Sequence, residues 1–275
     1  MYRIPIGDIF AEIVYWLSST FRAFFDAIRS AVNGIVSAIE WLLDLLPFWG
    51  FALIIAVAAY FLSGKGMVIF SVIGLLLIGS MGLWSETVST LALIITSTLI
   101  SLVIGIPLGI LSAKSRLVNK IMRPLLDFMQ TMPAFVYLIP AVFFFRIGVV
   151  PAAVATVIFS MPPAIRLTNL GIRQVPEELI EAGQSFGSNW KQMLFKIQLP
   201  QAMPTIMAGI NQCIMLSLSM VVIASMIGGR GLGDVVLTGI TSLDVGMGFE
   251  GGIAVVIIAI ILDRLTQGKT KKQHA

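Results

Sequence analysis

Long stretches of this chain carry no charged side chain, and their lengths predict helices that cross a membrane. The runs without Asp, Glu, Lys or Arg that separate charged residues are 87–113, 128–145, 147–165 and 197–229. An apolar helix needs about 20 residues to cross the hydrocarbon core of a bilayer. Further apolar stretches that can insert lie at 48–64, 66–84 and 248–265. The pattern predicts an all-α fold, a polytopic membrane bundle of about seven transmembrane helices.

Polar residues of the first 47 positions recur at spacings of three, four or seven, which is the periodicity of a helix. The residues between them are mostly Ile, Phe, Trp, Val and Leu. Segment 1–47 is therefore predicted to be an amphipathic helix that lies in the outer membrane interface or against the bundle and ends at Pro47. Amphipathicity favours a scaffold role for it over a sensing role.

The chain is predicted to have four parts. After 1–47 come two accessory transmembrane helices in 48–85 and a core of five transmembrane helices in 86–267, with a polar loop at 166–203; a basic tail, 268–275, follows. Prolines are expected to kink the fourth and fifth spans, because proline frees a backbone carbonyl and bends the helix. These are Pro133, Pro140, Pro151, Pro162 and Pro163.

Composition supports a membrane protein and charge sets its orientation. Hydrophobic residues make up 57% of the 275 residues and charged ones 12%, with a mean hydropathy of +0.97, which leaves too few charges to cover a soluble globule. Basic residues cluster at alternate ends of the predicted spans: Lys65; Lys114, Arg116, Lys120 and Arg123; Arg166, Arg173, Lys191 and Lys196; and Arg264, Lys269, Lys271 and Lys272. Such clusters face the cytoplasm. The polar loop and the C-terminus are therefore expected to be cytoplasmic and the N-terminus outside.

Several classes of function find no support in the sequence. The one cysteine, Cys213, lies inside a predicted span, and the one histidine, His274, is next to the end of the chain, so no metal site and no catalytic residue is expected. No G-x-x-x-x-G-K-[ST] phosphate loop occurs. The start shows no removable signal peptide. The chain is not expected to be an enzyme.

The polar loop carries the signals of two short helices joined by a turn. Pro176 with Glu177 and Glu178 predicts a helix start, since carboxylates complement the positive end of the helix dipole. Gly183 and Gly187 permit a close approach or a sharp turn. Ser188 or Asn189 then predicts a second helix, which would carry Trp190, Met193 and Leu194 on one face. Such a compact pair could seat in a groove of another protein.

These residues resemble the EAA signature of the permease subunits of ATP-binding cassette importers. The matching positions are Glu181, Ala182, Gly183, Gly187, Ile197, Leu199 and Pro200. Gly183 stands where the signature more often has Ala. From about 125 to 267 the chain further resembles glycine betaine and proline betaine importer permeases, in runs such as MQTMPAFVYLIP, PPAIRLTNLGIRQVPEELIEAG and LSLSMVVIASMIGGRGLGDVV.

The resemblance implies a type I importer in the cell membrane. Its implied parts are a homodimer of this permease within the lipid bilayer, two ABC ATPase subunits and an extracytoplasmic substrate-binding protein, with no nucleic acid. ATP and Mg would be bound by the ATPase, with no cofactor in this chain. ATPase coupling would pass through the 177–200 loop. The implied solute is a quaternary ammonium osmoprotectant of the glycine betaine or proline betaine kind.

Two further sets of residues are candidates for solute and partner contact. Polar groups inside apolar spans tend to face the bundle interior, which points either to the translocation path or to helix packing: Gln130, Thr131, Tyr137, Asn211, Gln212, Ser217 and Ser219. The predicted outer loop 228–251 holds charged candidates for contact with the binding protein: Arg230, Asp234, Asp244 and Glu250.

Three alternatives stay open from the sequence. An ion-coupled secondary carrier would need no ATPase, although such carriers show inverted repeats and charged groups within the spans, and neither is evident here. A membrane scaffold that transports nothing would leave the polar loop without a purpose. A permease of the same class could serve choline, carnitine or an amino acid.

Overall fold

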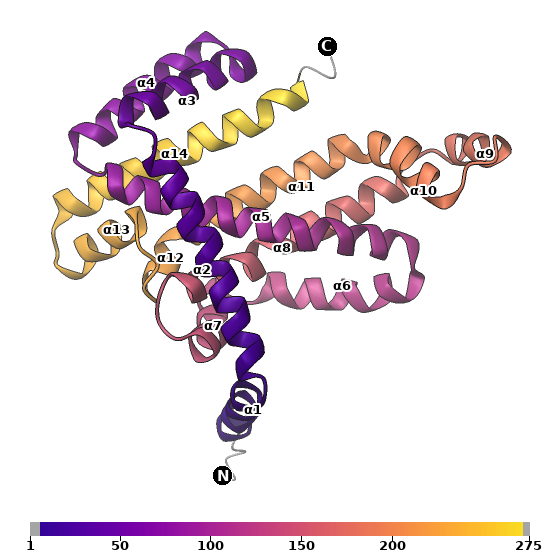
Figure 1. Cartoon of the computed structure of the whole chain (residues 1–275), viewed down its shortest axis with the longest axis horizontal. Coiled ribbons are helices and arrows are strands. Elements are labelled where there is room, and N and C mark those ends of the chain that lie inside the picture. The colour runs from indigo at the N-terminus through magenta and orange to yellow at the C-terminus, as the bar shows by residue number, and fades with distance from the viewer. Residues whose placement is uncertain (1–5, 272–275) are drawn as a thin grey trace.

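The computed structural model describes residues 6–271, and within that range the chain is a bundle of helices without a strand (Figure 1). The predicted all-α fold is confirmed. The helices in chain order are α1 (Ile6–Thr20), α2 (Arg22–Asp44), α3 (Phe48–Ser63), α4 (Lys65–Ser80), α5 (Trp84–Lys114), α6 (Arg116–Thr131), the 3₁₀ helix η1 (Ala134–Tyr137), α7 (Leu138–Phe145), α8 (Val149–Arg173), α9 (Glu177–Ser185), α10 (Trp190–Gln192), the π-helix η2 (Met193–Gln198), α11 (Leu199–Ser219), α12 (Val221–Ser225), α13 (Leu232–Thr241) and α14 (Val245–Lys271).

Four helical stretches of the described range are each long and apolar enough to cross a membrane. They are α5, α8, the continuous stretch Trp190–Ser219 and Val245–Gly268 of α14. Two bent pairs raise the number to six: α2 with α3, bent by 95°, and α6 with η1 and α7, bent by 110°. The sequence predicted seven. The difference arises because α3 and α4 have only 16 residues each, about 24 Å at 1.5 Å per residue.

The charge-free run 128–145 was expected to be one span, but the chain turns sharply inside it. Met132 has an extended backbone, with ψ at 135°, and Pro133 follows it. A residue before proline is disfavoured in the helical region, so α6 ends there. Pro162 and Pro163, by contrast, lie inside the unbroken helix α8. Proline thus breaks the expected fourth span and leaves the fifth continuous.

Helix α8 packs between α5 and α11, and small residues make the contact with α5 close. Ser97, Ser101, Gly105 and Gly109 recur every fourth position along one face of α5. Ser101 donates a hydrogen bond to the carbonyl oxygen of Val157 at 3.2 Å. A Cβ added at Gly109 would lie 2.6 Å from the Cβ of Thr168. Such small-residue stripes let membrane helices approach each other closely where burial from water gives no driving force.

The N-terminal segment, expected as one helix, is divided into α1 and α2. Helix α2 crosses the bundle at the end away from α9 (Figure 1). Val32 and Val36 of α2 are buried in one core cluster with Leu93 of α5 and Phe145 of α7. We call this end of the bundle the α2 end and the opposite end, which carries α9 and α10, the loop end.

The expected basic tail, 268–275, lies partly outside the described residues. Helix α14 continues to Lys271, and residues 272–275 are beyond the described range. The hydroxyl of Ser63 donates to the carbonyl oxygen of Arg264 at 2.7 Å, which ties the end of α3 to the last part of α14.

The α5–α8 contact gives a stability test. We expect Gly109→Ala to destabilise the protein by about 1–3 kcal/mol, because the new methyl group meets Thr168 and the backbone oxygen of Ile165 and forces the helices apart. Gly34→Ala in α2 is the control. It has nothing within 4 Å of the added Cβ and gains about 1 kcal/mol of helix propensity. Thermal unfolding in detergent measures both, and equal melting temperatures would contradict the packing account.

Candidate functional site

The loop end of the molecule is formed by a helical hairpin that stands apart from the spans. Helix α9 begins directly after Pro176, whose fixed φ of −55° and missing N–H suit a helix start. Glu177 and Glu178 lie in its first turn, where the positive end of the helix dipole favours carboxylates. The sequence predicted this start.

The turn between α9 and α10 contains a glycine with positive φ, and a capping box follows it at the start of α10. Gly187 has φ at +72°, the left-handed region that glycine adopts without strain. The side chain of Asn189 accepts a hydrogen bond from the N–H of Gln192 at 2.9 Å, and the side chain of Gln192 accepts one from the N–H of Asn189 at 2.8 Å. This capping box satisfies two backbone donors at the start of α10.

The two arms of the hairpin touch at Gly183. A Cβ added there would lie 2.6 Å from Cδ1 of Ile197 and 2.9 Å from Cε of Met193. Glycine at this position therefore lets η2 lie against α9. Both contacting atoms are the far ends of flexible side chains, so an alanine would require only small shifts of Ile197 and Met193.

The hairpin is anchored on one side and exposes apolar rings on the other. Met193 and Leu194 are buried, and Leu194 joins a core cluster with Ile172 of α8 and Ile206 of α11. Phe186, at the tip, is 90% exposed. The sequence expected Trp190 on the same face as Met193 and Leu194, but Trp190 is exposed.

Trp190 contacts the end of α5 instead. The ammonium nitrogen of Lys114 lies 4.2 Å from the centre of the Trp190 ring, within the range of a cation–π contact. The ammonium nitrogen of Lys191 lies 5.6 Å from the centre of the same ring. The hairpin is thus tied to α5 as well as to α8 and α11.

Of the signature residues, Leu199 and Pro200 form the first turn of α11. Glu181, Ala182 and Gly183 lie in the second half of α9, and Ile197 lies in η2. The structure thus brings all seven signature positions into one hairpin and the helix that follows it.

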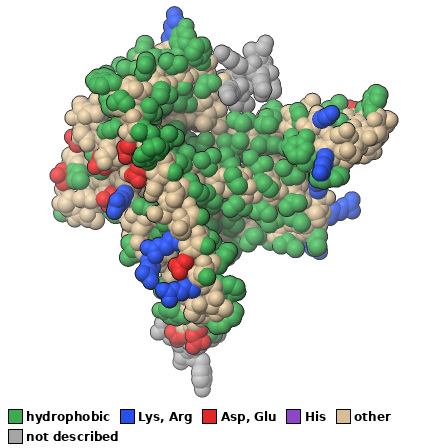
Figure 2. Space-filling model, in the orientation of Figure 1, with side chains coloured by type: hydrophobic (Ala, Val, Ile, Leu, Met, Phe, Trp, Pro, Cys, Tyr) green, Lys and Arg blue, Asp and Glu red, His purple; other side chains and the backbone are tan. Residues whose placement is uncertain are grey.

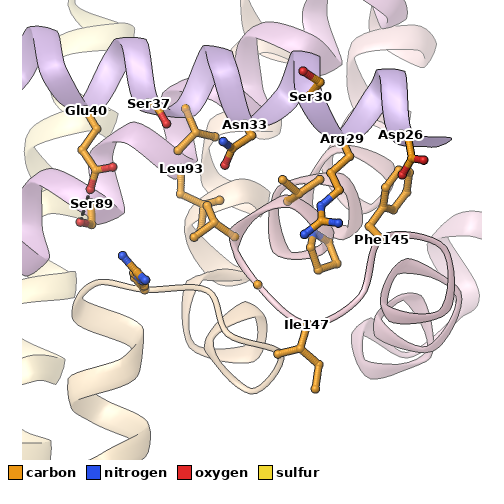
Figure 3. Close-up of a pocket in the computed structure, with 16 residues that line it drawn as sticks. Asp26, Arg29, Ser30, Asn33, Ser37, Glu40, Ser89, Leu93, Phe145 and Ile147 are labelled. Carbon is orange, nitrogen blue, oxygen red and sulfur yellow. Dashed lines mark hydrogen bonds between the residues drawn. The ribbon is translucent and has the colours of Figure 1, made fainter. Parts of the chain in front are cut away.

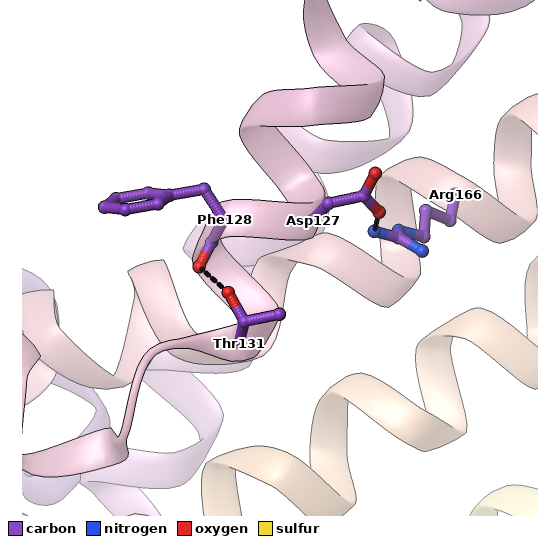
Figure 4. A network of polar contacts seen from close by, with 4 residues as sticks. All are labelled: Asp127, Phe128, Thr131 and Arg166. Carbon is purple, nitrogen blue, oxygen red and sulfur yellow. Dashed lines mark hydrogen bonds and ion pairs between the residues drawn. The ribbon is translucent and has the colours of Figure 1, made fainter.

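A polar network, part of which Figure 4 shows, joins α6 to α8. Arg166 of α8 forms an ion pair with Asp127 of α6. Further along α8, Asn169 donates to Asn119 at 2.8 Å, and Arg173 donates to Asn169 at 2.8 Å. These groups line a cavity of about 390 Å³. This network was not predicted from the sequence, although Asp127 and Arg166 each border a charge-free run.

The α2 end holds a second cavity, of about 470 Å³, under helix α2 (Figure 3). Its walls come from the polar stripe of α2, from Ser89 of α5, from the turn 147–151, whose last three residues begin α8, and from Arg230. Glu40 accepts a hydrogen bond from Ser89 at 2.6 Å. The loop that carries Arg230 is fixed by a hydrogen bond from the N–H of Leu232 to the hydroxyl of Thr90 at 2.8 Å. The N-terminal segment and the 228–251 loop, both predicted to lie outside, therefore meet in one place.

The other charged candidates of the 228–251 segment lie at this same end. Asp234 is in the first turn of α13 and, with Arg230, lines an adjoining cavity of about 320 Å³. Asp244 accepts a hydrogen bond from the N–H of Met247 at 3.0 Å and so caps the start of α14. Glu250 is exposed on α14.

The candidates for the translocation path fall into two groups. Ser217 is buried and accepts a hydrogen bond from Thr98 at 3.3 Å, and Tyr137 is buried and donates to the carbonyl oxygen of Met129, so both have packing positions within the chain. Asn211 is half-buried, and its side-chain oxygen has no hydrogen-bond partner among the described residues. The remaining candidates are exposed on the surface of the single chain: Gln130, Thr131, Gln212 and Ser219.

Residues 105–267 match the family of binding-protein-dependent transport system inner membrane components. The chain belongs to this family. The permease is 55% identical to the glycine betaine/carnitine transport permease protein GbuB of Listeria monocytogenes, over 98% of this chain and 96% of that protein. It is 53% identical to the glycine betaine transport system permease protein OpuAB of Bacillus subtilis, over 98% and 96%.

A solved structure supports the fold of the permease. A chain of the inward-facing MetNI methionine ABC transporter matches with a TM-score of 0.60 and 22% identity, over 70% of this chain and 94% of that chain. This similarity confirms the predicted fold class, a helix bundle of the type I importer permease kind.

Phe186 was not predicted from the sequence as a functional residue. Its signal was available, because a large apolar ring next to Gly187 in a polar loop is unusual unless something covers it. Arg29 of α2 and Arg230 both line the α2-end cavity but are about 200 residues apart in the chain, so only the fold brings them together.

The turn at Gly187 gives a second test. We expect Gly187→Val to open the hairpin, because a β-branched residue is strained at φ of +72°. Gly187→Asn is the matched control, since asparagine tolerates the left-handed region. Hydrogen exchange of the backbone amides in 186–194 should rise in the valine variant and stay near the native rate in the asparagine variant. Equal exchange in both variants would show that the turn does not depend on this backbone conformation.

Proposed function

We propose that this permease is the membrane-spanning subunit of an importer for glycine betaine and related quaternary ammonium osmoprotectants. The observation that supports the solute class is its similarity to GbuB and OpuAB, at 55% and 53% identity over nearly the whole of each chain. Carnitine, choline and proline betaine share the quaternary ammonium group and belong to the same class. Competition among them for uptake of labelled glycine betaine would rank the solutes.

The loop end is proposed to face the cytoplasm. Eight of the basic residues that border the spans gather there, namely Lys114, Arg116, Lys120, Arg123, Arg166, Arg173, Lys191 and Lys196. Short cytoplasmic loops carry such an excess of Lys and Arg. Acidic residues lie mainly at the opposite end, where Figure 2 shows them over α13 and α14. The α2 end and the N-terminus then face outward, and the end of α14 faces inward.

The hairpin of α9, α10 and η2 is proposed to couple the permease to a separate ATPase. An exposed aromatic tip on a capped turn is suited to fill an apolar pocket of a partner, since buried aromatic anchors dominate many interfaces. Leu194 in the core and Trp190 on Lys114 connect the hairpin to three spans, so movement of the ATPase would be transmitted to α5, α8 and α11. Two ATPase copies, one for each hairpin of a permease dimer, would bind ATP and Mg.

A permease homodimer is supported by polar groups on the outside of the single chain. Gln212 and Ser219 of α11 and Gln130 and Thr131 of α6 are exposed on helices that count among the spans or bent pairs. Amide groups in contact with lipid tails cost free energy, because no water satisfies them there. A second copy that covers them would place the translocation path between the two chains.

The ATPase contact can be tested at Phe186. We expect Phe186→Asp to abolish recovery of the ATPase when the permease is purified in mild detergent from its native membrane, because a charge would enter an apolar pocket. Leu243→Asp is the control, since Leu243 is 86% exposed at the α2 end and Asp tolerates its φ of +57°. Recovery of no ATPase even with the native permease, together with uptake driven by an ion gradient, would favour a secondary carrier.

The dimer can be tested by cross-linking at Gln212. The native Cys213 is fully buried, so the unmodified permease should not react with a bifunctional maleimide. We expect Gln212→Cys to give a cross-linked dimer, and Ile73→Cys, exposed on α4, to give none. Dimers from Ile73→Cys alone would move the contact surface to α4 and contradict a path between the α11 helices.

A further inference from the structure

We infer that the cavity under α2 is a docking site for acidic side chains of the extracytoplasmic binding protein, with Arg29 and Arg230 as the groups that bind their carboxylates. The inference rests on the proposed function, because it requires the α2 end to face outward. It assigns a role in partner binding to α2, which lies outside the residues 105–267 that match the family.

The site has a defined shape. Its volume of about 470 Å³ is more than ten times that of a water molecule in the liquid, about 30 Å³, so it has room for side chains of a partner. In Figure 3 the side chain of Arg29 extends from α2 into the space above the turn at Ile147. Arg230 lines both this cavity and the adjoining one of about 320 Å³.

The walls of the cavity are fixed by packing and hydrogen bonds. Val32 and Val36 hold α2 against the core. The N–H of Gly148 donates to the carbonyl oxygen of Ile227 at 2.8 Å, which joins the turn 147–151 to the loop before Arg230. The arginines therefore extend from a preformed surface, which lowers the entropy lost when a partner binds.

Some charged side chains of the cavity already have a partner within the chain and others do not, and this difference indicates what the site binds. Oδ2 of Asp26 lies 3.8 Å from Nε of Arg22, and Glu40 accepts a hydrogen bond from Ser89. The side chains of Arg29 and Arg230 have no hydrogen bond or ion pair with any residue of the described range. Each guanidinium thus offers unused donors in the planar arrangement that matches a carboxylate. The charges of the cavity that lack a partner are positive.

A protein surface fits the site better than a lipid headgroup. Figure 2 shows Lys and Arg side chains gathered over α2 and α7, with acidic groups among them. A lipid phosphate is one compact negative group and would lie near Asp26 and Glu40 as well as near the arginines. A folded partner can place its own acidic and basic groups separately and so match a surface of mixed charge.

The test uses the complete complex of permease, ATPase and binding protein in nanodiscs, with ATPase activity measured as the binding protein is titrated. We expect Arg29→Gln to raise the concentration of binding protein for half-maximal stimulation by about 10-fold, with basal ATPase activity unchanged. Arg29→Lys should recover part of the loss, because it keeps the charge but not the planar donors. Arg22→Gln is the matched control, an exposed arginine of the same helix that does not line the cavity. Its ion pair with Asp26 is solvent-exposed and contributes little, so this variant should change the titration less than about twofold.

Two results would overturn the inference. An Arg29→Gln titration that coincides with the native one would show that the cavity does not contribute to docking. An effect seen with anionic lipid but absent in nanodiscs of phosphatidylcholine alone would assign the arginines to a lipid headgroup. A native complex that the binding protein does not stimulate would instead overturn the proposed function itself, so the two failures are distinguishable.

Discussion

The close contact between α5 and α8 is the constraint on which the other features of this permease depend. Membrane helices gain little from burying apolar side chains against one another, because lipid tails are equally apolar. Their association depends on packing and on a few hydrogen bonds. The stripe from Ser97 to Gly109 provides both, since its small side chains admit the backbone of α8 and its hydroxyls bond to α8 carbonyl groups. Both functional regions are attached to the ends of this helix pair.

At the loop end, the core extends into the hairpin without a flexible joint. Leu194 packs with residues of α8 and α11, and the helical path from α10 through η2 into α11 is continuous. At the α2 end, the same helices carry the turn and the loop that form the cavity. A rigid central pair thus connects a surface suited to an apolar partner with a surface suited to an acidic one, about one membrane thickness apart, on the order of 30 Å.

Local features of the fold could be predicted from the sequence, and features that join distant segments could not. Pro176, Gly187 and Asn189 act on neighbouring backbone, so the start of α9, the turn and the cap of α10 were predictable. The turn at Met132 carried a local signal in Pro133, but the charge-free run around it matched a straight span equally well. The position of Trp190 depends on Lys114, and the Asp127–Arg166 pair and the α2-end cavity depend on how the helices pack. None of these could be read from periodicity.

The π-helical segment η2 sets the rotational phase between the hairpin and the long helix that follows it. In an α-helix each residue turns the chain by about 100°, since 3.6 residues complete one turn. A π-turn accommodates an additional residue, and so it shifts every later side chain around the helix axis relative to the hairpin. The six residues Met193–Gln198 therefore determine which face of α11 carries Gln212 and Ser219. An insertion or deletion of a single residue within η2 would leave both the hairpin and α11 folded but would direct those amide and hydroxyl groups toward a different neighbour.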